Sequence, residues 1–167
     1  MTNTNITLNT DLTKASVNEG QDAVAAFIFS KPLSSAVTLQ ATRSLEGATT
    51  ADVGIFQFST NGGASWNGVA STGNITLAAG INSLQLRSTT TTDAFTEFGE
   101  AVRFSLVHSA SQPGLSDFWY LDSGSIGIKD PAATVVTTRG FMDQLADGPL
   151  KLVGQSYLTS LGDATDY

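Results

Sequence analysis

The sequence predicts an all-β protein: a seven- to eight-stranded antiparallel immunoglobulin-like β-sandwich, followed by a short C-terminal helical tail. Three observations support this fold class. Apolar and polar residues alternate through the first 130 positions, turn residues recur at roughly 8–15-residue spacing, and a helical spacing of apolar residues begins only after position 138. With 167 residues, the chain is long enough to bury a substantial core.

The predicted strands follow one another from the N-terminus. A weak strand at Ile6–Leu8 precedes Ala23–Ser30, where apolar residues at successive positions predict burial on both faces. Lys31-Pro32 ends this strand because proline has no amide hydrogen to donate to a ladder. Asn61-Gly62-Gly63 is a hairpin-turn signal. The other strands are expected at Ala36–Ser44, Gly54–Thr60, two positions within Gly73–Ser88 around Ala79-Gly80, Ala101–His108 and Phe118–Asp130.

The pattern changes after Asp130, so we expect a sandwich at 1–130 and a linker with two short helices at 131–167. The helices are predicted at Arg139–Gly148 and Pro149–Asp163, where apolar residues recur every three or four positions. Pro149 suits the first helical turn. Helices this short need to dock on other structure to be stable.

Composition and charge exclude several classes of protein. The formal net charge is −7 and the basic residues are scattered, which argues against nucleic-acid binding. The absence of cysteine excludes disulfides and thiolate metal sites. No apolar run is long enough for a membrane span. The N-terminal residues carry no basic and apolar regions of the kind found in a cleavable signal peptide, so none is expected in this chain.

Three acidic residues crowd the segment before the strand Ala101–His108. Asp93, Glu97 and Glu100 lie within eight residues, in a chain with only four glutamates. Such carboxylates repel one another unless a cation, a base or water compensates them. Glu97 and Glu100 would face opposite ways in an extended segment. Glu100 is therefore expected to be structural, paired with backbone amides or with Arg103 or Arg87.

Five motifs occur in an order that resembles a known family. They are "SVNEG" (16–20), "GATTADVGIFQFSTNGG" (47–63), "ITLAAGINSLQLRS" (75–88), "DAFTEFGEAVRFSLV" (93–107) and "GSIGIKD" (124–130). This order and spacing are similar to those of the Calx-β-like repeats of bacterial surface adhesins and sodium–calcium exchangers. The resemblance covers residues 16–130.

The resemblance implies a seven-stranded sandwich that binds Ca²⁺ at one end through carboxylates from separate loops. The implied ligands are Glu19, Asp52, Asp93, Glu97 and Asp130. The chain departs from the family where Thr92 replaces the first of two aspartates, where Val53 replaces a tyrosine, and where Pro131 follows Asp130 in place of further acids. Fewer carboxylates leave one weakly held ion or none.

Two tryptophans are candidates for a ligand-binding role. Trp66 follows the predicted hairpin turn, and Trp119 lies in the aromatic run "FWY" at 118–120. Exposed tryptophans beside polar residues can stack on sugars, whereas core packing and cross-strand pairing are the more common use of such rings. His108, the single histidine, is expected at a surface or core edge rather than as a ligand.

No catalytic motif is present, so we expect a non-catalytic structural or adhesive module, extracellular or on a cell surface. Neighbouring domains of a larger chain would be its partners. One alternative is a self-assembling subunit of a surface fibre, coat or virion, a homo-oligomer in which the arm Met1–Asn9 donates a strand to a neighbour. Another is a module that binds a surface glycan.

Overall fold

The computed structural model describes residues 4–93, 99–108, 115 and 119–130, without the side chain of Trp119. The chain divides into two units, Met1–Ala133 and Thr134–Tyr167. The second unit, with both predicted helices, lies outside the described residues. All ten described strands belong to the first unit.

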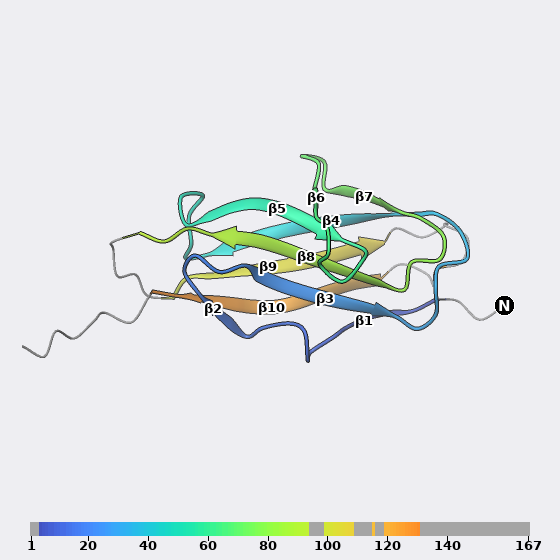
Figure 1. The fold of residues 1–167 in the computed structure, drawn as a ribbon, viewed down its shortest axis with the longest axis horizontal. Helices are drawn as coiled ribbons and strands as arrows, with labels where there is room; N and C mark the ends of the chain where they lie inside the picture. The colour runs from blue at the N-terminus through green and yellow to red at the C-terminus, as the bar shows by residue number, and fades with distance from the viewer. Residues whose placement is uncertain (1–3, 94–98, 109–114, 116–118, 131–167) are drawn as a thin grey trace, which may run out of the picture. The chain divides into compact units, whose positions relative to one another are not determined.

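Ten strands form two five-stranded sheets in the described residues, and these residues contain no helix (Figure 1). The first sheet has the order β1 (Ile6–Leu8), β3 (Ala23–Phe29), β8 (Ser83–Thr90), β5 (Val53–Ser59), β6 (Asn67–Gly68). The second has the order β2 (Ser16–Asn18), β10 (Trp119–Lys129), β9 (Ala101–His108), β4 (Val37–Glu46), β7 (Asn74–Leu77). The predicted all-β class is confirmed.

The strand count differs from the predicted seven to eight because short edge strands add to it. Of these, β2 has three residues and β6 has two, too few to show an alternating pattern. The hairpin at Asn61-Gly62-Gly63 is confirmed, since β5 pairs with β6 across it. Part of the N-terminal arm, Ile6–Leu8, pairs with β3 of the same chain.

Neighbouring strands are antiparallel with one exception among the described pairs. β2 runs parallel to β10, with Ser16 opposite Gly127, Val17 opposite Ile128 and Asn18 opposite Lys129. Parallel strands end on the same side of a sheet. The residues that follow these two strands are therefore brought together.

The core consists of apolar residues from the inner faces of both sheets. Phe27, Leu84 and Leu86 of the first sheet and Phe104, Leu106 and Ile126 of the second are fully buried. The rings of Phe56 and Phe104 stack between the sheets, with centroids 5.7 Å apart.

The sequence predicted that the strand at Ala23–Ser30 is buried on both faces. In the structure only one face of β3 (Ala23–Phe29) lies fully in the core. Ala25, Phe27 and Phe29 enter the core, but Val24 is half-buried and Ile28 is 44% exposed. Among the described residues no second sheet covers this face: Ala26 is 3% exposed, but Val24 and Ile28 reach solvent there. Apolar side chains often remain on protein surfaces, which is why this pattern misled the prediction.

We predict that Phe104→Ala lowers the free energy of unfolding by about 3–5 kcal/mol, because it removes a buried ring and leaves a cavity. Urea unfolding followed by tryptophan fluorescence measures the change. Ile55, 63% exposed on β5, provides the control: Ile55→Ala should cost less than about 0.5 kcal/mol. Equal losses for the two variants would contradict this assignment of the core.

Candidate functional site

Four of the five predicted calcium ligands lie in segments at one end of the sandwich, which we call the acidic pole. Glu19 follows β2, Asp52 precedes β5, Asp93 follows β8 and Asp130 follows β10. These strand ends lie together at the left of Figure 1. The fifth predicted ligand, Glu97, lies outside the described residues.

The parallel pairing of β2 with β10 brings Glu19 beside Asp130. The register that sets Asn18 opposite Lys129 places the next residue of each strand side by side. The amide of Glu19 donates to the carbonyl oxygen of Lys129 at 2.9 Å, and the two carboxyl groups lie within hydrogen-bonding reach.

The residues that follow β8 also lie beside Glu19, and a backbone amide holds them there. The amide of Asp93 donates to Oε2 of Glu19 at 3.3 Å. The Thr90 hydroxyl donates to the carbonyl oxygen of Gln21 at 2.7 Å. Gly20 has a φ of +76°, and a Cβ there would meet the Thr92 hydroxyl, so this approach requires glycine.

Glu19 is buried in unfavourable surroundings for a charged carboxylate. Its residue surface is 8% exposed. Removal from water raises the pKa of Glu19 above its usual 4.5, and the charges of Asp130 and Asp93 raise it further, while the Asp93 amide lowers it. Glu19 therefore favours a proton, or a bound cation in its place.

Asp52 belongs to a second acidic pair in the same pole, with Glu100. Its carboxylate accepts hydrogen bonds from the hydroxyl and the amide of Thr49, which lower the pKa of Asp52 below its usual 3.8, and the Glu100 side chain adds to this effect. The backbone oxygen of Asp52 accepts the Thr91 amide at 2.8 Å. Asp52 is thus held as a charged carboxylate.

Of the partners expected for Glu100, Arg103 pairs with Glu46 and Asp122, and Arg87 pairs with Asp22. Glu100 is instead 7% exposed and lies against Asp52. Its position directly before β9 was visible in the sequence, but a contact with the β4–β5 loop was not.

The described acids form pairs rather than a complete ligand shell. In residues 4–93, 99–108, 115 and 119–130, no group of three His, Cys, Asp or Glu residues could hold a metal ion by itself. Hard oxygen donors nevertheless fit Ca²⁺, which also takes backbone carbonyls and water as ligands. Glu19 and Asp130 are the described pair that would hold it.

Trp66 lies beside an arginine rather than in an open aromatic platform. The guanidinium carbon of Arg87 lies 4.2 Å from the centroid of the indole, a cation–π contact. Arg87 is in turn held by Asp22 at 2.7 Å and by Gln57 at 2.9 Å. One face of Trp66 therefore serves the packing of this sheet. The Trp119 side chain lies outside the described part of the structure.

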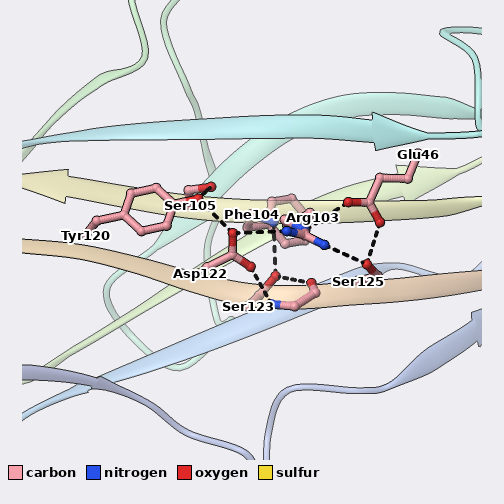
Figure 2. A network of polar contacts seen from close by, with 9 residues as sticks. Glu46, Arg103, Phe104, Ser105, Tyr120, Asp122, Ser123 and Ser125 are labelled. Atoms are coloured by element: carbon pink, nitrogen blue, oxygen red, sulfur yellow. Dashed lines mark hydrogen bonds and ion pairs between the residues drawn. The ribbon is translucent and has the colours of Figure 1, made fainter.

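A polar network covers the outer side of β9 and β10 (Figure 2). Arg103 forms ion pairs with Glu46 at 2.9 Å and Asp122 at 3.7 Å. Tyr120 donates its hydroxyl hydrogen to Asp122 at 2.7 Å. The network spans a bulge between Asp122 and Ser125, so these groups stabilise an irregular strand.

Comparisons with known proteins leave the family of this chain open. No protein-family model matches the chain, and a comparison with curated proteins gives no match. A DUF4466 family protein from Parabacteroides merdae, known from a crystal structure, is 17% identical with a TM-score of 0.33. The match covers 74% of this chain but only 44% of that chain. A likeness this distant carries no argument about fold or function.

No helix within the described residues is long and apolar enough to cross a membrane.

We predict that Glu19→Gln raises the unfolding midpoint in calcium-free buffer at pH 7.5, by roughly 1–4 °C. The change removes a charge next to Asp130 but keeps an oxygen that can accept the Asp93 amide. The pKa of Glu19 is higher in the folded than in the unfolded protein, so the folded protein binds this proton at a higher pH. The wild type therefore becomes more stable as the pH falls towards 4.5. The advantage of the variant should therefore shrink at pH 5.

Asp22→Asn provides the control, since it removes a charge from the same turn but breaks an ion pair with Arg87. It should not raise the midpoint. A lower midpoint for Glu19→Gln than for the wild type at pH 7.5 in EDTA would contradict the electrostatic description of the pole.

Proposed function

We propose that this chain is a non-catalytic structural or adhesive module of an extracellular or surface protein, an immunoglobulin-like sandwich of the Calx-β-like type whose acidic pole binds Ca²⁺. The observation that carries the proposal is the buried Glu19 beside Asp130, with Asp93 close by. A protein keeps such a repulsive contact when something compensates it.

The chemistry of the pole suits a hard divalent cation. Its donors are carboxylate oxygens on separate segments, and the formal net charge of the chain is −7. When bound, Ca²⁺ supplies positive charge and takes oxygen ligands. Glu19 and Asp130 would hold it, with Asp93 and Glu97 as further ligands, and Asp52 would stay with Thr49 and Glu100.

Binding there would join three parts of the fold. Glu19 belongs to the turn between β2 and β3, Asp93 to the end of β8 and Asp130 to the end of β10. Asp130 is also the first residue after β10, the last strand of the described fold. A cation at this place would stiffen the end of the module, as a supporting or joining domain requires.

We predict that 1 mM CaCl₂ raises the thermal unfolding midpoint over that in EDTA by roughly 5–10 °C. A site with a Kd of about 10 μM would be about 100-fold saturated and contribute about 2.7 kcal/mol. Light scattering in each condition should give the same mass. Mg²⁺ should give a smaller shift because it demands a stricter geometry and keeps its waters.

Variants separate the pole from general charge effects. Glu19→Gln should abolish most of the calcium shift, whereas Glu46→Gln, an acid of the Arg103 network, should leave it unchanged. No shift in the wild type would make these carboxylates ordinary loop residues. A large mass that persists in EDTA, with no shift, would favour the self-assembling subunit instead.

A further inference from the structure

A cleft of about 420 Å³ lies away from the acidic pole, beside the middle of β4. One wall is β4 itself, the opposite wall is the segment 69–73 that joins β6 to β7, and a side chain of β5 contributes as well. The volume lies within the range of small-molecule sites. Its lining includes Gln40, Thr42, Arg43, Phe56, Ser71 and Thr72.

The second wall is held against β4 by backbone contacts. The amide of Ala41 donates to the carbonyl oxygen of Gly73 at 2.8 Å, and the Gly73 amide donates to Ala70 at 2.8 Å. Gly73 has a φ of +76°, and a Cβ there would lie 2.6 Å from the Ala41 oxygen. Only glycine permits this close approach, so the segment 69–73 is held in a fixed position against β4.

Arg43 is oriented in this cleft through one of its nitrogens. Nη1 donates to the carbonyl oxygen of Gly54 at 2.6 Å and to Oγ of Ser88 at 2.7 Å. Its guanidinium carbon lies 5.8 Å from the centroid of the Phe56 ring. The edge formed by Nε and Nη2 makes no hydrogen bond to the described residues. Two parallel N–H groups on that edge match the two oxygens of a carboxylate.

The charge of Arg43 also lacks an acidic partner within the part of the chain that the structure describes. Arg87 and Arg103, by contrast, pair with carboxylates at 2.7 and 2.9 Å. Partial burial lowers the pKa of Arg43 below its usual range, which reflects the cost of taking this cation from water. An anion in the cleft would offset that cost.

We propose that this cleft binds a carboxylate-bearing sugar, a uronic acid, with its carboxylate on the Nε–Nη2 edge of Arg43. The hydroxyl groups of Ser71 and Thr72, on the wall opposite β4, provide partners for sugar hydroxyls. Because the net charge of the chain is −7, a ligand with a single carboxylate is repelled less than a highly charged anion. This site is independent of calcium at the acidic pole.

The test is a titration of the ¹⁵N-labelled chain with D-galacturonate and D-glucuronate, followed by NMR. We expect a Kd on the order of 1 mM, typical of a ligand of this size, with shifts in the amides of residues 40–43 and 69–73. D-galactose and D-glucose, which lack the carboxylate, should bind at least tenfold more weakly. Equal binding of acid and neutral sugars would overturn the role of Arg43, and equal binding of acetate would overturn the sugar assignment.

Variants locate the site. Arg43→Gln should weaken uronate binding about tenfold or more, whereas Arg103→Gln, with the same loss of charge, should leave it unchanged. Ala70 is exposed and lines the cleft, so Ala70→Asp tests the site without removing a contact of Arg43. Its carboxylate should compete for Arg43 and block the uronates. Unchanged binding in Ala70→Asp, or an equal loss in Arg103→Gln, would overturn the proposal.

Discussion

The contact between Glu19 and Asp130 depends on one feature of the sheets, the parallel pairing of β2 with β10. Antiparallel neighbours would send the residues after these strands to opposite ends of the sheet. The parallel register instead sets two carboxyl groups side by side, and the end of β8 adds the amide and the charge of Asp93. Backbone hydrogen bonds thus hold together side chains that repel one another, and a proton or a cation is needed to relieve them.

Among the described residues, charged side chains have three kinds of surroundings. Arg87 and Arg103 are paired with carboxylates and stabilise the outer faces of the sheets. The acids of the pole are paired with each other. Arg43 is held by neutral oxygens and keeps two donors for a ligand. Because only 14% of the residues are charged, each departure from ordinary ion pairing is informative about where a ligand would bind.

The all-β class and most strands followed from the sequence, because alternation directly reports which face of a strand is buried. Val37, Leu39 and Ala41 are buried as their spacing indicates. What alternation lacks is information on which strands pair. The neighbours β2 and β10 are more than 100 residues apart, so their parallel pairing had no local signal. The same limit hid the contact of Glu100 with Asp52 and the cleft around Arg43, since both join segments that are distant along the chain.

The titration of the Glu19 carboxyl group itself tests the central claim most directly. With only four glutamates in the chain, its side-chain ¹³C signal can be assigned by substitution and followed against pH in EDTA and in CaCl₂. We predict a pKa above 4.5 in EDTA, and a clear fall when calcium is present because the cation competes with the proton. A pKa at or below 4.5 in EDTA, unchanged by calcium, would contradict both the repulsion at the pole and its use as a cation site.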